Sequence, residues 1–131
     1  VIWLNLTGSG NETAAHIQAV NRMTIMFCSF TKKPLILRLY GTVKCYHRTD
    51  TEFETLSAHF PDFKGKRQIF DVNVEMVQTS CGYAVPFYEF KEERTRLVDW
   101  AEKKADDDEW KAYWTEKNTL TIDGKPTGIK M

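Results

Sequence analysis

A chain of 131 residues, 42% of them hydrophobic and 27% charged, is long enough to bury one core and too balanced in composition for a disordered or fibrous protein. Its 18 Lys and Arg residues are matched by 18 Asp and Glu residues, so the formal net charge is zero and no overall field favours nucleic acid or an anionic membrane as a partner. We therefore expect a single domain over residues 1–131, in which any anion site is local.

The cysteines and the apolar segments indicate the compartment. The three cysteines form an odd set without C-x-x-C spacing, which argues against a disulfide framework and a structural zinc site. No apolar stretch approaches the roughly 20 residues that span a bilayer. The first residues, Val1–Leu4, lack the basic start and long apolar core of a signal peptide. These features predict a cytoplasmic protein without a membrane segment.

The beginning of the chain predicts a strand, a turn and a helix. Residues 2–6 form a short apolar run that ends at the turn-forming cluster 7–11. The apolar positions that follow predict a helix through residues 14–20, with Asn11 or Ser9 as the residue whose side chain caps it. The order of these elements places a glycine-rich turn directly at a helix start.

The middle of the chain is rich in predicted strands. Residues 23–30 and 35–47 are dominated by apolar and β-branched residues, and Gly41 interrupts the alternation of the second run, which is typical of a bulge in a curved barrel strand. Residues 51–60 have the spacing of a short amphipathic helix. Residues 68–79 alternate apolar and polar side chains and predict a half-buried strand.

The last third of the chain predicts a helical segment over about residues 91–118. A charged helix with one apolar side is expected at 92–105, and a second short helix carries Trp110 and Trp114. The aromatic side chains there could cover a flat ligand, although their helical spacing favours core packing. The acidic run 106–109 is interpreted as a solvated break between the two helices rather than a metal site.

The glycine-rich turn carries the main chemical signal. Glycines and free N–H groups at a helix start can hold a phosphate group. Thr13 stands at the third glycine position of a dinucleotide fingerprint, and no acidic residue lies between Glu12 and Asp50 to bind a ribose, so a Rossmann site is excluded. No Gly-Lys-Ser/Thr follows either, which excludes a P-loop. From spacing alone, an ordinary capped turn explains the residues better than a phosphate site.

Other candidate sites are weaker. The three histidines are scattered singly, so no metal site is expected. Cys81 lies near a turn, but no base is identified beside it, and a lone cysteine is more often a small buried hydrophobe. The basic turn 64–67 could receive a phosphate, and a solvated turn explains it equally well. No catalytic side chain is identified by these patterns.

Five stretches of the chain resemble a subgroup of the pyridoxamine 5'-phosphate oxidase-like family: residues 3–16, 26–28, 37–41, 77–83 and 100–104. The run Gln78–Tyr83, the run Trp100–Lys104 and the closing Ile122–Pro126 are its most specific parts. The resemblance implies a mainly-β fold with peripheral helices (α+β), namely a split β-barrel of the FMN-binding type. It also implies a homodimer that holds FMN, or a deazaflavin relative, at the subunit interface.

The resemblance also implies which residues hold the cofactor. Ser9, Gly10, Asn11 and Thr13 fall where family oxidases bind the flavin phosphate, and Arg38 matches a recurrent basic position of the family. These five residues are the predicted cofactor-binding set.

Two departures from the family pattern qualify this set. Family oxidases carry two basic residues where this chain has Glu12 and Thr13. Because a carboxylate repels a phosphate, we expect either that Glu12 turns away or that N–H groups, Ser9 and Thr13 hold the phosphate. The subgroup also has one more hairpin before the equivalent of Trp3, so we expect an N-terminally truncated member.

Together these features predict a flavin-dependent oxidoreductase whose small-molecule substrate is unidentified. The flavin ring supplies the redox chemistry in such enzymes, so no catalytic triad is required. The alternative is a non-catalytic dimerisation or binding module of the same family with an incomplete flavin pocket.

Overall fold

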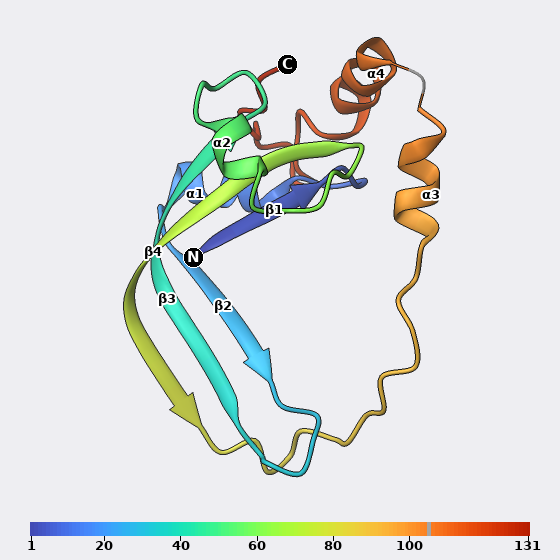
Figure 1. The fold of residues 1–131 in the computed structure, drawn as a ribbon. Coiled ribbons are helices and arrows are strands. Elements are labelled where there is room, and N and C mark those ends of the chain that lie inside the picture. The colour runs from blue at the N-terminus through green and yellow to red at the C-terminus, as the bar shows by residue number, and fades with distance from the viewer. Residues whose placement is uncertain (105) are drawn as a thin grey trace.

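The computed structural model describes residues 1–104 and 106–131. Its centre is a four-stranded antiparallel sheet in the order β1-β4-β3-β2. The strands are β1 (Ile2–Leu6), β2 (Met23–Cys28), β3 (Ile36–His47) and β4 (Lys66–Ser80). The sheet curls so that its two edge strands, β1 and β2, lie on the same side of the molecule (Figure 1). This mainly-β fold with peripheral helices fits a split barrel.

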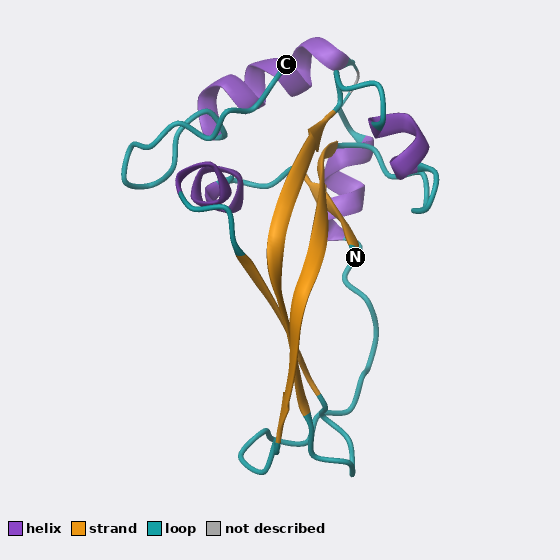
Figure 2. Ribbon diagram, turned by 90° about the vertical axis from the view of Figure 1, so that its left-hand side faces the viewer, coloured by secondary structure: helices purple, strands orange, loops and turns teal. Residues whose placement is uncertain are grey.

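The helices gather around one end of the sheet, as Figure 2 shows. They are α1 (Glu12–Ala19), α2 (Phe53–Ser57), α3 (Arg96–Glu102) and α4 (Asp107–Lys117). The opposite end of β2, β3 and β4 extends away from the helices as a three-stranded arm, which we define as residues 23–41 and 74–80 (Figures 1 and 2). The fold therefore has a helix-covered end and an uncovered end.

The predicted bulge at Gly41 is confirmed. The pairing of β3 with β4 shifts between Tyr40, which lies opposite Met76, and Gly41, which lies opposite Val74. A Cβ atom at Gly41 would collide with the carbonyl oxygen of Asn73, so glycine is required here by the close approach of two backbones. The bulge bends the sheet at the point where the arm begins.

Several predicted elements are shorter than expected. The helix predicted at 51–60 is the single-turn α2, and the helix predicted at 92–105 begins only at Arg96; its predicted last residue, Ala105, lies outside the described residues. The side chains of residues 92–95 are exposed, so no burial offsets the cost of ordering them as a helix. The predicted break at 106–109 is wrong, because Asp106 caps α4 by accepting from the N–H groups of Asp108 and Glu109.

The strand predicted at 68–79 is confirmed as part of β4, but its burial differs between its two halves. Phe70 and Val72 are fully buried, whereas Met76 is 55% exposed and Val77 is 59% exposed. Residues 67–70 are buried in succession and residues 75–79 are all exposed, so burial depends on where the helices pack more than on the alternation of the strand.

Two apolar clusters form the core. In the first, Ala14 and Ile17 of α1 pack against Val43 of β3 and against Phe70 and Val72 of β4. The second joins Ala101 of α3 to the buried indoles of α4, Trp110 and Trp114. The second cluster confirms that the C-terminal aromatic residues serve core packing.

The C-terminal segment is fastened to the end of β3. The backbone N–H of Lys130 donates to Nδ1 of His47 over 3.2 Å, and the Lys130 ammonium group lies 2.7 Å from the Asp50 carboxylate. His47 is 7% exposed, and burial lowers its pKa. Since Nδ1 accepts a hydrogen bond, the neutral imidazole is the form that fits this site.

No helix among residues 1–104 and 106–131 has the length and apolar character needed to cross a membrane.

The two valines of β4 give a matched test of where the core ends. Val72→Ala should lower the free energy of unfolding by about 2 kcal/mol, because it removes buried methyl groups from the first cluster. Val77→Ala removes the same atoms from an exposed position and should change it by less than about 0.5 kcal/mol. Urea unfolding followed by tryptophan fluorescence measures both values, and equal losses would contradict the described burial.

His47 makes a pH-dependent contribution to stability. Its pKa is lowered in the folded state, so the unfolded chain binds a proton that the folded chain resists. The contribution of His47 to the free energy of unfolding should therefore be fully present above pH 6.5, the ordinary pKa of histidine. It should fall as the pH drops below that value. Urea unfolding at about pH 7.5 and about pH 5 should show this loss in the native chain and a smaller loss in His47→Gln. Identical losses in the two proteins would rule out His47 as the cause.

Candidate functional site

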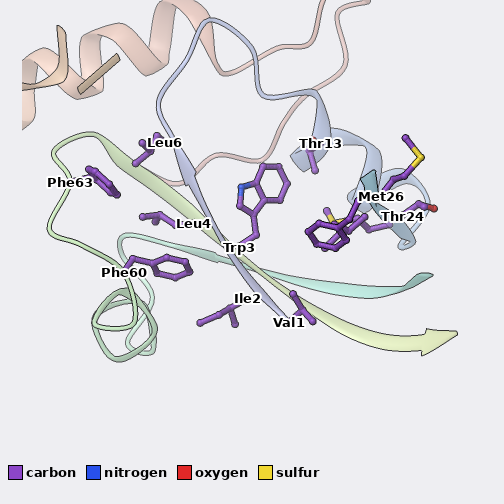
Figure 3. Close-up of a pocket in the computed structure, with 13 residues that line it drawn as sticks. Val1, Ile2, Trp3, Leu4, Leu6, Thr13, Thr24, Met26, Phe60 and Phe63 are labelled. Carbon is purple, nitrogen blue, oxygen red and sulfur yellow. The ribbon is translucent and has the colours of Figure 1, made fainter. Parts of the chain in front are cut away.

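An apolar groove of about 690 Å³ lies between the two edge strands of the sheet. Its walls come from β1, from β2, from the first turn of α1 and from the segment after α2 (Figure 3). The side chains that give it an aromatic character are Trp3, Phe27, Phe60 and Phe63. Its volume and its mostly apolar walls are those of a small-molecule site.

Trp3 stands at the centre of this groove (Figure 3). Its ring lies 5.2 Å from the ring of the buried Phe70, centroid to centroid, and 41% of the residue is exposed. The indole is thus supported by the core on one side and accessible on another. A flat aromatic ligand could stack on such a surface.

Buried hydrogen bonds hold the loop between β1 and α1 in place. The backbone N–H and the hydroxyl group of Thr7 both donate to the carbonyl oxygen of Gly65, each over 2.8 Å. The same hydroxyl oxygen accepts a hydrogen bond of 2.9 Å from the indole N–H of Trp114. Gly65 has φ +74°, a value that side-chain-bearing residues rarely adopt, so the contact depends on glycine.

A second contact holds the next residue of the loop. The carbonyl oxygen of Gly8 accepts from the side-chain amide of Asn118 over 2.9 Å and from the guanidinium group of Arg67 over 3.5 Å. Arg67 is 4% exposed, and burial lowers its pKa to about 10, against the opposing effect of the nearby Glu12 carboxylate. Arg67 therefore supports the loop from inside the protein.

The basic turn 64–67 is not a solvated turn throughout. Lys64 pairs with Glu102 of α3 over 3.3 Å, and Lys66 pairs with Asp62 over 3.0 Å. Since Arg67 is buried as well, all three cations of this turn are engaged within the chain.

The structure separates the predicted cofactor-binding residues into two places. Ser9, Gly10, Asn11 and Thr13 lie at the start of α1, and of these Thr13 lines the groove. Arg38 lies in the arm, where its guanidinium group donates to the hydroxyl of Ser80 over 3.0 Å. The described contacts do not join Arg38 to the loop, and the cofactor-binding role of all five residues stays a prediction.

The expected side-chain cap of α1 is not formed. Asn11 occupies the N-cap position, but its side chain makes no capping hydrogen bond. The residue is 3% exposed, and neither its amide nitrogen nor its carbonyl oxygen has a partner. Ser9 is exposed and makes no cap bond either. The Asn11 side chain is thus buried without capping the helix.

Glu12 does not turn away from the loop. One of its carboxylate oxygens accepts from the backbone N–H of Ile122 over 3.3 Å. The other lies so close to Gly10 that a Cβ atom at this glycine would collide with it. At Gly8, by contrast, a Cβ atom would meet nothing within 4 Å. The open face of the loop is therefore at Gly8, and Glu12 covers Gly10.

Sequence reasoning assigned no binding role to most of the groove residues. Trp3 was part of the family resemblance only, and Phe60 belonged to a predicted amphipathic helix. One feature of the sequence did point to the groove. Apolar side chains lie on both faces of residues 2–6, which indicates that each face of this strand contacts apolar residues.

The described residues contain no group of three or more His, Cys, Asp and Glu side chains that could hold a metal ion. Cys28, Cys45 and Cys81 are free thiols. Burial, together with the nearby Asp50 carboxylate, raises the pKa of Cys45 to about 12, so this thiol is protonated at neutral pH. Cys81 is exposed.

The curled antiparallel sheet with peripheral helices fits a split barrel. The chain is similar to the pyridoxamine 5'-phosphate oxidase family protein ustO of Aspergillus flavus, with 29% identity over 140 residues. The match covers 96% of this chain and 56% of that relative, so the chain spans little more than half of the relative's length. No protein-family profile and no solved structure matches the chain. The similarity supports the pyridoxamine 5'-phosphate oxidase family.

The Thr7 hydroxyl group can be tested as the support of the loop. Thr7→Val removes the hydroxyl and leaves the buried indole N–H of Trp114 without its acceptor, which should lower the free energy of unfolding by about 1–3 kcal/mol. Thr7→Ser keeps the hydroxyl and should lose less than half as much. Denaturant unfolding measures the free energy of unfolding of the two variants. A Val variant as stable as the Ser variant would contradict the described hydrogen bonds.

Proposed function

We propose that this chain is a flavin-binding member of the pyridoxamine 5'-phosphate oxidase family and that it takes FMN into the groove between β1 and β2. The observation that carries the proposal is the groove itself, which has the size of a cofactor site and an accessible indole at its centre. The similarity to a family protein over nearly the whole chain supports it independently.

The residues present fit the ring of a flavin. The tricyclic ring is flat and largely apolar, and Trp3, Phe27 and Phe60 offer it aromatic contacts. Thr13 is the groove residue that belongs to α1, so a ligand extending along the groove meets the start of this helix. In this arrangement the exposed Ser9 and the free backbone face at Gly8 are the contacts available to the phosphate end.

A bound flavin would supply the capacity to accept or donate a hydride. The chain's own residues would bind and orient the ring: Trp3 by stacking, and Thr13 by a hydrogen bond from its hydroxyl group. The apolar walls of the groove would exclude water from the ring. On this basis the function is that of an FMN-dependent oxidoreductase with a small-molecule substrate.

A second copy of the chain is part of the proposal. Both edges of the sheet are free of strand partners among the described residues, and free edges favour pairing with another chain. The arm exposes large apolar side chains that a partner would cover: Met26, Phe27, Met76 and Val77. A homodimer would enclose the groove, which is open in the single chain.

One observation favours the alternative of a non-catalytic binding or dimerisation module. The loop after β4 exposes four large aromatic residues: Tyr83, Phe87, Tyr88 and Phe90. Exposed aromatic side chains of this kind are typical of protein interfaces. A module of this kind would dimerise without binding flavin.

Titration of the purified protein with FMN tests the proposal. We expect quenching of flavin fluorescence that saturates at one FMN per chain. Thr13→Val should weaken FMN binding about tenfold by removing one hydrogen bond to the ligand, about 1.4 kcal/mol. Thr115→Val, the same change on an exposed face of α4, is the matched control and should bind as the native chain does.

The FMN titration separates the two candidate functions, and the mass of the protein in solution tests the dimer that both of them require. A dimer that binds FMN agrees with the flavin protein, and a dimer that leaves flavin fluorescence unchanged agrees with the binding module. A Thr13→Val variant with native affinity would remove Thr13 from the site.

A further inference from the structure

The segment 128–131 begins at a firmly held residue and a glycine. The backbone N–H of Thr127 donates to the carbonyl oxygen of Thr119 over 3.0 Å, and the carbonyl oxygen of Thr127 accepts from the side-chain amide of Gln18. Gly128 follows with φ +64°, a conformation that side-chain-bearing residues rarely adopt. The chain therefore enters this segment from a fixed point through a glycine turn.

Lys130 makes the polar contacts that hold this segment against the end of β3. Its backbone N–H donates to Nδ1 of His47 over 3.2 Å, and its ammonium group pairs with Asp50 over 2.7 Å. Ile129 packs against the second apolar cluster, and Met131 lines, together with Lys130, a pocket of about 280 Å³ beside α4. The segment thus closes one side of this pocket.

His47 is the group in this corner whose charge changes between about pH 7.5 and about pH 5. Cys45, whose Sγ lies 3.8 Å from Nε2 of His47, stays protonated because burial raises its pKa to about 12. The pKa of Asp50 is lowered by the backbone N–H of His47 and by the Lys130 ammonium group, so this carboxylate stays charged. On β4 the residue opposite His47 is the neutral Gln68.

Two arginines near the imidazole keep their charge over the same range. Arg67 of β4 acts electrostatically on Cys45, and Arg48, the residue after His47, pairs with Asp107 of α4 over 3.0 Å. Guanidinium groups are not deprotonated at these pH values. A change of charge in this corner between these two pH values is therefore a change at His47.

We propose that the segment 128–131 is a pH-sensitive strap, which neutral His47 holds closed and which opens when this imidazole takes a proton. An imidazolium group carries N–H donors at both ring nitrogens, so its Nδ1 no longer accepts from the N–H of Lys130. The added positive charge also repels the nearby Lys130 ammonium group. Because other bonds hold Thr127, the opening begins at Gly128 and uncovers the pocket beside α4.

The sign of the pH dependence follows from the closed state. Burial and the Lys130 ammonium group lower the pKa of His47, against the opposing effect of the Asp50 carboxylate. A histidine released from these contacts returns toward its ordinary value of 6.5, so the closed strap loses stability as the pH falls below 6.5. Since one proton is taken up, the ratio of open to closed strap should rise by at most about tenfold per pH unit.

Methyl NMR of Ile129 tests this inference, because a methyl group packed against tryptophan rings has a resonance displaced by those rings. In the native chain, titrated from about pH 7.5 to about pH 5, this resonance should move toward its unfolded-chain position. The movement should have the same midpoint as the titration of the His47 ring. The methyl resonances of Ile17 in the first cluster should stay in place, since only the strap opens.

His47→Asn is the test variant. Its side-chain carbonyl oxygen offers an acceptor near the position of Nδ1 and takes up no proton, so the strap should stay closed over the whole range. His59→Asn, the same change at an exposed histidine, is the matched control and should open as the native chain does.

Two results with the native chain alone would overturn the strap. One is an Ile129 resonance that stays in place or moves with a midpoint different from that of His47. The other is a simultaneous movement of Ile17, which would show unfolding of the whole domain. A His47→Asn variant whose Ile129 resonance still moves as in the native chain would also overturn it. These readouts use no flavin, so the proposed function is tested separately.

Discussion

The burial of one stretch of β4 is the constraint on which the rest of the structure depends. At Phe70 this strand pairs with β1 on one side and β3 on the other, and the Phe70 ring contacts both the α1 cluster and Trp3. The sheet and α1 thus meet at one side chain that is fully buried. Beyond Val74, which still packs against the first cluster, residues 75–79 are exposed, so the same sheet continues as an exposed arm. The contrast between the two ends follows from where the helices pack.

The same constraint creates the groove. Because β4 and β3 are central, β1 and β2 are left as edges, and the curl of the sheet brings their apolar side chains to a common cavity. Thr7 joins this region to α4, since its hydroxyl links the loop before α1 to the indole of Trp114. The loop that begins α1 is therefore held by residues more than 100 positions away in the sequence. A site built in this way depends on the packing of α4 as much as on its own residues.

Charge is distributed unevenly around this loop. A buried guanidinium group, Arg67, supports it from within, while the carboxylate of Glu12 lies on its outer side. The interior cation donates to a carbonyl oxygen over 3.5 Å, leaves its buried Nε without a hydrogen-bond partner and does not reach the surface. The glycine-rich start of α1 is consequently a weaker anion site than its glycine content alone indicates, and the apolar groove is the stronger feature of the candidate site.

Local patterns in the sequence determined the strands, the glycine-rich turn, the bulge at Gly41 and the core role of Trp110 and Trp114, because alternation, turn residues and helical spacing act over a few neighbouring residues. The sequence also indicated the family, which the similarity to a curated relative supports. Only the tertiary structure decided that Asn11 is buried without a cap bond, that Glu12 covers Gly10, and that Trp3 and Phe60 share a groove. The groove joins residues far apart in the chain and Glu12 contacts the distant Ile122, so these outcomes depend on which surfaces the folded sheet leaves uncovered.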